Sequence, residues 1–179
     1  MKNEDLAHRD SRHLWHPLTQ HKTAASPLGI VKAKGALFYD ENGKEYIDGI
    51  ASWYTAVYGH CHPHITAAMT KQMQELDFVM FSGFTHRPAV ELSERLMNIL
   101  PENQSKIFFN DNGSTAVEAA IKMALQYYHN QGKKRDTLIA FEDGFHGDTF
   151  GAMSASGLSS YNGPFQDFLL KVERIPVPT

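Results

Sequence analysis

The spacing of apolar residues predicts one hairpin and several helices in the first hundred residues. Residues 28–48 alternate apolar and polar side chains around the sequence Glu41-Asn42-Gly43-Lys44, which predicts a β-hairpin. Apolar residues recur at helical spacing in residues 63–77 and 86–100, so an amphipathic helix is predicted in each stretch. A shorter polar helix is expected within residues 3–13.

From residue 106 onward, short apolar runs alternate with helical patterns. Residues 106–110 (KIFFN) and 137–141 (TLIAF) are typical of buried strands, and residues 171–178 are expected to form or approach a third. Helices are predicted over residues 114–130 and 149–156. The long helix is expected to bury one stripe of side chains: Val117, Ala120, Ile121, Ala124 and Tyr127 or Tyr128. Strands separated by helices pair in parallel, so the predicted fold class is α/β, a mostly parallel sheet flanked by helices.

Composition fits a packed globular protein. Hydrophobic residues make up 42% of the 179 residues and charged residues 21%, which excludes a disordered chain. The net charge of −3 gives no basic surface for nucleic acid or anionic lipid, so neither is expected as a partner. Cys61 is the single cysteine and the first residues are too polar for a secretory signal, so a cytoplasmic location is expected.

Charge is distributed unevenly along the chain. Residues 49–70, 78–86 and 149–166 carry no Asp, Glu, Lys or Arg, and they are rich in aromatic and small residues. Such windows are typical either of surfaces that contact a ligand or another chain, or of plain core.

The first candidate site is Asn110-Asp111-Asn112-Gly113-Ser114-Thr115, which follows a predicted strand and opens a helix. Backbone N–H groups at a helix N-terminus bind anions, and Gly113 would let a phosphate approach the hydroxyls of Ser114 and Thr115. The spacing matches neither a Walker A loop nor a dinucleotide fingerprint. The alternative is an ordinary helix cap.

The second candidate loop, residues 143–149, follows the next predicted strand and is expected to lie beside the first. Phe145 could stack on a planar ring, and His146 and Asp148 could donate or accept hydrogen bonds. Alternatively, Phe145 fills the core and Asp148 caps the following helix.

A third candidate is the aromatic pair Trp53 and Tyr54, either a wall for an apolar substrate or a core or interface pair. The nearby sequence His60-Cys61-His62-Pro63-His64 suggests a metal, but no second Cys/His cluster completes a closed site, so no metal is expected. An anion cradle, a stacking ring and an aromatic wall together predict pyridoxal 5′-phosphate as cofactor.

Several longer strings carry a resemblance to a known family. They are HLWHPLTQ at 13–20, YIDGIASWYTAVYGHCHP at 46–63, VMFSGFTHRPAVELSERL at 79–96, NDNGSTAVEAAIKMALQYY at 110–128 and GFHGDTFGAMS at 144–154. With these strings the chain resembles the N-terminal portion of the class III, fold type I pyridoxal-phosphate aminotransferases, and among them the diaminononanoate synthases of biotin biosynthesis.

The resemblance implies that residues 1–60 form an N-terminal segment with a hairpin and residues 61–179 the first part of the large cofactor-binding domain. The rest of that domain and a C-terminal small domain would lie outside this chain. It also implies that Gly113 and Ser114 hold the cofactor phosphate, with Thr115 and His146 nearby, and that Phe145 lies against the ring. Trp53 and Tyr54, with Phe145, would line the substrate pocket of a homodimer.

The implied reaction is transamination of 8-amino-7-oxononanoate to 7,8-diaminononanoate, with S-adenosylmethionine as the unusual amino donor. Leu18 and Phe145 stand where the family usually has tyrosine, which leaves lysine open as donor. The family's Schiff-base lysine has no counterpart here, so we expect these 179 residues alone to be inactive, with no catalytic residue among them. The alternatives are another class III ω-amino-acid transaminase, or a non-catalytic phosphate- or metal-binding module.

Overall fold

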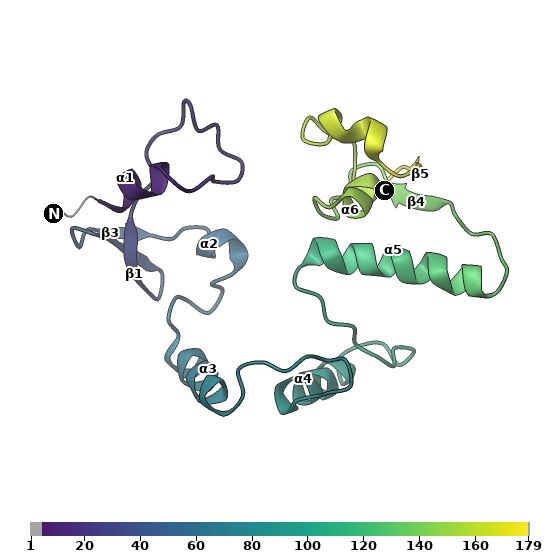
Figure 1. Cartoon of the computed structure of the whole chain (residues 1–179), viewed down its shortest axis with the longest axis horizontal. Helices are drawn as coiled ribbons and strands as arrows, with labels where there is room; N and C mark the ends of the chain where they lie inside the picture. The colour runs from purple at the N-terminus through teal and green to yellow at the C-terminus, as the bar shows by residue number, and fades with distance from the viewer. Residues whose placement is uncertain (1–4, 179) are drawn as a thin grey trace. The chain divides into compact units, whose positions relative to one another are not determined.

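The computed structural model describes residues 5–178, which divide into two compact units between His86 and Arg87 (Figure 1). The predicted domain boundary after residue 60 stays a prediction.

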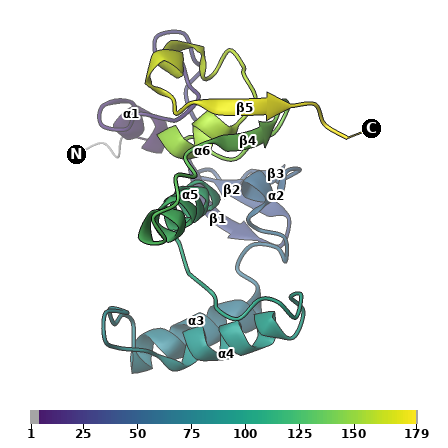
Figure 2. The same cartoon turned by 90° about the vertical axis from the view of Figure 1, so that its right-hand side faces the viewer.

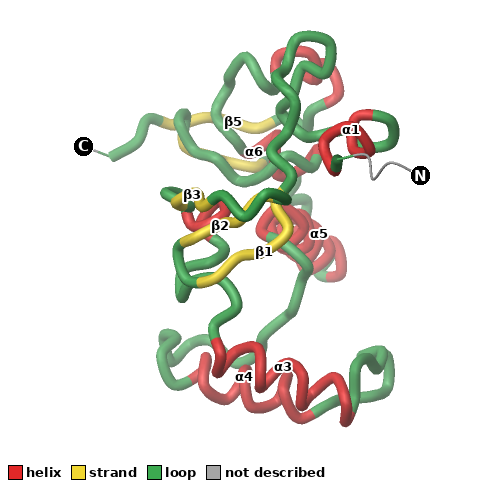
Figure 3. The backbone as a smooth tube through the Cα atoms, turned by 90° about the vertical axis from the view of Figure 1, so that its left-hand side faces the viewer, coloured by secondary structure: helices red, strands yellow, loops and turns green. Residues whose placement is uncertain are grey.

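The first unit contains a three-stranded antiparallel sheet in the order β1-β2-β3 (Figure 3). Its strands are β1 (Ile30–Lys34), β2 (Leu37–Asp40) and β3 (Glu45–Ile47). The hairpin predicted around residues 41–44 is confirmed as β2 and β3, and β1 adds a strand that the pattern did not separate.

Asp40 organises the turn between β2 and β3. Its carboxylate accepts hydrogen bonds from the N–H groups of Asn42 and Lys44, at 2.9 and 3.0 Å, and from the Tyr46 hydroxyl at 3.0 Å. Burial alone would raise the pKa of Asp40, but these bonds to its charged form outweigh burial and lower it. Gly43 completes the turn with φ +78°, a value that glycine adopts without strain.

Three helical segments accompany this sheet: α1 (Leu6–Ser11), α2 (Ala51–Tyr54) and α3 (Pro63–Glu75). Asp5 caps α1 by accepting a hydrogen bond from the His8 N–H, and Pro63 occupies the first position of α3, where its missing N–H costs nothing. The predicted helices at residues 3–13 and 63–77 are thereby confirmed.

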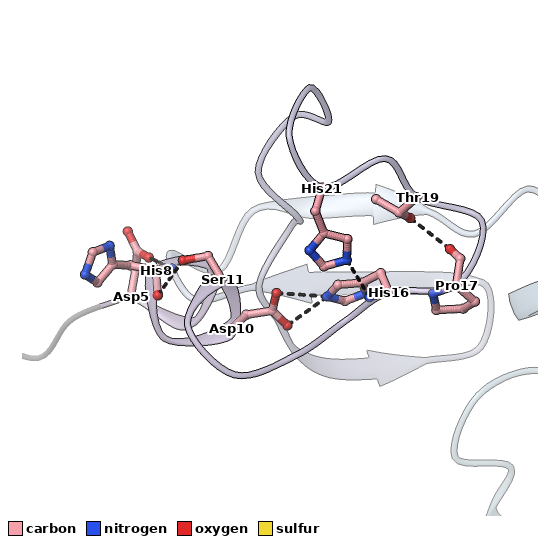
Figure 4. A network of polar contacts seen from close by, with 8 residues as sticks. All are labelled: Asp5, His8, Asp10, Ser11, His16, Pro17, Thr19 and His21. Carbon is pink, nitrogen blue, oxygen red and sulfur yellow. Dashed lines mark hydrogen bonds and ion pairs between the residues drawn. The ribbon is translucent and has the colours of Figure 1, made fainter.

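The segment that follows α1 is held by two histidines (Figure 4). The His16 ring contacts the Asp10 carboxylate through Nε2, at 2.8 and 3.0 Å, and the His16 N–H donates to Nε2 of His21 at 2.9 Å. His21 also lies edge-on to Trp15. Side-chain contacts therefore hold the Trp-His-Pro segment, which has no regular secondary structure.

The second unit contains α4 (Arg87–Met97), α5 (Gly113–Asn130), β4 (Leu138–Phe141), α6 (Phe150–Ala155), the 3-10 helix η1 (Gly163–Phe168) and β5 (Val172–Ile175). Strands β4 and β5 pair in parallel, with Leu138 opposite Val172 and Phe141 opposite Ile175 (Figure 2). Parallel pairing is confirmed, as are the helices predicted over residues 86–100, 114–130 and 149–156. The larger, mostly parallel sheet stays a prediction, because within residues 5–178 the parallel pairing consists of β4 and β5.

The core of the second unit surrounds α6. Ala152 and Ser154 are fully buried, and the Arg174 guanidinium on β5 donates through Nη2 to the carbonyls of Ser154 and Ser156 at 2.9 and 3.0 Å. A cation at the C-terminal end of a helix satisfies carbonyls that have no partner within the helix. This contact joins α6 to β5.

Two predictions about this unit are wrong. Residues 106–110 form no strand, because no neighbouring strand in the described chain pairs with them. The expected apolar stripe on α5 is also not buried: no residue of α5 is buried, and Tyr127 is among the exposed large side chains. The contacts of α5 with α6 instead involve polar side chains near its N-terminus.

Candidate functional site

Helix α5 begins with a capping box. The Asn112 side chain accepts a hydrogen bond from the Thr115 N–H at 3.0 Å, and the Thr115 hydroxyl lies 3.4 Å from the Asn112 N–H. The same hydroxyl donates to Asp111 at 2.5 Å, and this bond is the main reason that the pKa of Asp111 is lowered. Thr115 therefore uses its polar groups to build the helix start, and its role towards a ligand stays a prediction.

The cap leaves the first two N–H groups of α5 available. Within residues 5–178 the N–H groups of Gly113 and Ser114 have no hydrogen-bond partner, and a Cβ at Gly113 would meet open space. Unpaired N–H donors, the positive end of an 18-residue helix and a residue without a side chain are what a phosphate needs. The residues present therefore fit a phosphate group at this end of α5.

The loop over residues 144–149 lies against this helix start, as predicted. Ser114 Oγ is 2.7 Å from Thr149 Oγ1 and accepts a hydrogen bond from the Thr149 N–H at 2.9 Å. Gly147 is buried with φ +132°, and a Cβ there would overlap the Ser114 side chain and lie 2.7 Å from Ser114 Cα. Only glycine permits this approach.

Glu118, one turn further along α5, fixes this helix to α6. Its Oε1 accepts hydrogen bonds from the N–H groups of Gly151, at 2.5 Å, and Ala152, at 3.1 Å. The pKa of Glu118 is lowered, first by its hydrogen bond with Thr149 and then, against the effect of burial, by these two N–H groups. The carboxylate therefore caps the N-terminus of α6, a role that sequence reasoning did not predict.

Phe145 and His146 extend from the same loop. Phe145 is 76% exposed, so the alternative in which it fills the core is wrong. The His146 N–H donates to Ser156 Oγ at 3.0 Å, while its side chain is exposed. Thr149 occupies the N-cap position of α6 and Glu118 satisfies its N–H groups, so Asp148 does not cap this helix. An exposed ring beside the start of α5 is suited to stacking.

Trp53 and Tyr54 lie in the first unit, on α2, and are 68% and 77% exposed. They are not core residues, which leaves a substrate wall or an interface. The segment is a left-handed turn, because φ is +47°, +46°, +60° and +67° at Ala51, Ser52, Trp53 and Tyr54. Each residue other than glycine in this conformation costs about 1–2 kcal/mol, and such strain persists only where the surroundings impose it.

A buried carboxylate lies beside this turn. The Asp48 side chain is 3% exposed, and its Oδ2 lies 2.9 Å from the Ser52 hydroxyl and 2.7 Å from Nε2 of His60. The Ser52 N–H and then the His60 ring stabilise the charged form and lower the pKa of Asp48 to about 2. Sequence reasoning missed this cluster, because its members are 4 and 12 residues from Asp48 and match no motif.

Two negative findings apply to residues 5–178. In this part of the chain no three His, Cys, Asp or Glu side chains are grouped to hold a metal ion. No helix there has both the length and the apolar composition needed to cross a membrane.

Comparison with known proteins gives consistent matches. The family model for class-III aminotransferases matches residues 19–179. A Synechococcus elongatus protein named adenosylmethionine-8-amino-7-oxononanoate aminotransferase is 48% identical over 166 residues, which are 93% of this chain and 39% of that protein. A Geobacter sulfurreducens protein of the same name is 40% identical over 172 residues, 94% of this chain and 38% of its own length. The chain thus spans about two fifths of these curated relatives.

Solved structures agree with these matches. The crystal structure of adenosylmethionine-8-amino-7-oxononanoate aminotransferase from Methanocaldococcus jannaschii matches with a TM-score of 0.90 at 34% identity, over 97% of this chain and 40% of that one. An ω-transaminase from Pseudomonas jessenii, in complex with PMP, matches with a TM-score of 0.86 at 30% identity, over 98% of this chain and 40% of that one.

Proposed function

Because the chain belongs to the class-III aminotransferase family, we propose that the complete protein that carries it converts 8-amino-7-oxononanoate to 7,8-diaminononanoate in biotin biosynthesis. The observation that carries this proposal is the identity of up to 48% with proteins named for that activity, over most of this chain. The cofactor would be pyridoxal 5′-phosphate.

Residues of this chain would bind the cofactor phosphate and one face of its ring. The N–H groups of Gly113 and Ser114 would donate to the phosphate, whose charge the α5 dipole stabilises. Phe145 would lie against the ring, and His146 is a candidate for a further hydrogen bond. When bound, pyridoxal phosphate supplies the electron sink that transamination requires.

Other residues of this chain would bind the substrate. We propose that Trp53 and Tyr54 form an apolar wall, because their rings are exposed rather than packed in a core. Phe145 lacks the hydroxyl that a tyrosine would offer to substrate, and Leu18 lacks one as well. S-adenosylmethionine is the proposed amino donor, with lysine as the alternative.

The remaining machinery would lie outside these residues. Each lysine that could be considered lies exposed in or beside a charged stretch, with no enclosing apolar pocket in the described chain to favour the neutral amine, so none is a suitable covalent partner for the cofactor: Lys71, Lys106, Lys122, Lys133 and Lys134. We therefore expect the 179 residues alone to be inactive. We also propose a homodimer, in which exposed apolar side chains such as Phe78 and Phe84 would be covered.

The test is an assay of the complete protein with 8-amino-7-oxononanoate as acceptor and S-adenosylmethionine or lysine as donor. The expected result is turnover with this acceptor and growth of a biotin auxotroph that lacks its own enzyme. The likeness to an ω-transaminase favours a second candidate function, transfer from ω-amino acids. Preference for 4-aminobutyrate or ornithine, without complementation, would overturn the biotin assignment and support the second candidate.

A further inference from the structure

The left-handed turn Ala51–Tyr54 contains no glycine, although all four residues have φ between +46° and +67°. Side chains of L-residues disfavour this conformation, and a run of four in succession is unusual. A strained turn is retained only where neighbouring groups determine it. The residues that hold the turn in this conformation therefore contribute to its function.

Two side chains contact one atom, Oδ2 of Asp48, which precedes the turn. The Ser52 hydroxyl donates to it from within the turn, at 2.9 Å, and His60 Nε2 contacts it from beyond the turn, at 2.7 Å. His60 is itself fixed to the sheet, because it exchanges two backbone hydrogen bonds with Gly35, at 2.8 and 3.0 Å, and its ring lies 4.8 Å from that of Phe38. The turn is thus tied at Ser52 to a largely buried hydrogen bond between Asp48, the residue that follows β3, and His60, in the segment before α3.

The same geometry argues against a catalytic relay by these three residues. In a Ser-His-Asp relay the two ring nitrogens of histidine face different partners, one the carboxylate and the other the hydroxyl. Here the single atom His60 Nε2 lies 2.7 Å from Asp48 and 3.4 Å from Ser52. What the network does is hold the backbone that carries two exposed aromatic rings.

We propose that His60 and Asp48 are positioning residues of the substrate site: through Ser52 they hold the left-handed turn that presents Trp53 and Tyr54 to the amino-acceptor substrate. This proposal rests on the proposed aminotransferase function. Neither His60 nor Asp48 would touch substrate. Because the cofactor phosphate would be held by residues of the other unit, loss of the network should weaken substrate binding and leave cofactor binding intact.

The test compares His60→Ala, His60→Gln and a control, His64→Gln, in the complete protein. Glutamine places an N–H close to the position of Nε2, so His60→Gln should keep the contact with Asp48. His64 is an exposed residue of α3 with no role in the network. The double variant His60→Ala/Ala51→Gly should recover part of the loss, because glycine adopts positive φ without strain.

For His60→Ala we expect KM for the acceptor to rise about tenfold, the factor expected for losing one charge-assisted hydrogen bond, with kcat and affinity for pyridoxal phosphate changed less than about twofold. Chymotrypsin cleavage after Trp53 or Tyr54 should accelerate by a similar factor, because proteases need an extended backbone. His60→Gln and His64→Gln should resemble the wild type in both measurements.

Three outcomes would overturn the proposal: an unchanged KM, an unchanged cleavage rate, or an equal loss of cofactor affinity, which would indicate general unfolding. The cleavage assay needs no turnover, and KM is measured with whichever acceptor the wild type uses. A wild-type protein that prefers another acceptor would therefore refute the biotin assignment without deciding the role of His60.

Discussion

Replacing Gly147 with alanine is the most direct test of the proposed phosphate site. A Cβ at this position would lie 2.7 Å from Ser114 Cα and overlap the Ser114 side chain. Carbon atoms in contact are normally about 3.5–4.0 Å apart, so the loop and the start of α5 must separate by about 1 Å. Both hydrogen bonds between Ser114 and Thr149, now 2.7 and 2.9 Å, would then exceed bonding distance.

The magnitude follows from these contacts. Each lost hydrogen bond costs about 0.5–1.5 kcal/mol, and holding alanine at φ +132° costs about 1–3 kcal/mol. We therefore expect a total penalty of about 2–6 kcal/mol. This penalty lowers the free energy of unfolding, and if cofactor binding requires the two segments to close again, it also lowers affinity for pyridoxal phosphate by about 30-fold or more.

The assay uses the complete apoprotein of the wild type, Gly147→Ala and the matched control Gly132→Ala. Gly132 also has positive φ, +66°, but a Cβ there would meet open space, so only dihedral strain of about 1–2 kcal/mol is expected. Cofactor affinity is measured by titration followed by absorbance, and stability by urea unfolding. The reasoning is refuted if Gly147→Ala matches Gly132→Ala in both measurements.

Three further predictions concern the turn and the carboxylates. Ala51→Gly should raise the free energy of unfolding, measured in urea, by about 1 kcal/mol, because glycine relieves the strain of positive φ. The control Ala67→Gly, in the exposed middle of α3, should lower it by about 1 kcal/mol. A change in the same direction in both variants would contradict the strain argument. Glu118→Gln should cost about 0.3–1 kcal/mol in the same assay, because the charge at the start of α6 is lost, and an unchanged midpoint would contradict this role. The pKa of Asp48 is lowered to about 2, so its contribution to stability is present above pH 4 and is lost as pH falls towards 2. In Asp48→Asn the free energy of unfolding should therefore depend less steeply on pH between pH 4 and 2. The same pH dependence in variant and wild type would contradict this prediction.

The sequence predicted the elements whose causes are local. Helix ends are marked by residues that act on the backbone of their immediate neighbours. These are Pro63 at the start of α3, Asn112 at the N-cap of α5 and Gly132 two residues after the end of α5. Parallel pairing of β4 with β5 also followed, because a helix between two strands leaves few other connections. Such features depend on residues that are close together in the sequence.

The features that the sequence did not predict depend on distant residues. The apolar run at residues 106–110 is a good strand candidate, but a strand exists only where another strand pairs with it. The left-handed turn contradicts the preferences of its own residues, and it is held by Asp48 and His60 from outside. The loop over residues 144–149 does lie beside the start of α5, yet the contact is made by Ser114 and Thr149 rather than by a shared sheet edge.

The uncharged windows illustrate why composition alone left two interpretations open. In the α6 part of residues 149–166 the absence of charge reflects burial, because Gly151, Ala152 and Ser154 are buried there, whereas Leu158 and Tyr161 further along are exposed. In residues 49–70 no residue is buried, and Trp53 and Tyr54 are largely exposed. Exposed aromatic side chains on a strained backbone, held by the hydrogen bond between His60 and Asp48, cost stability and give no core in return. Contact with a ligand or another chain would offset this cost, which is why we propose the substrate wall in this window.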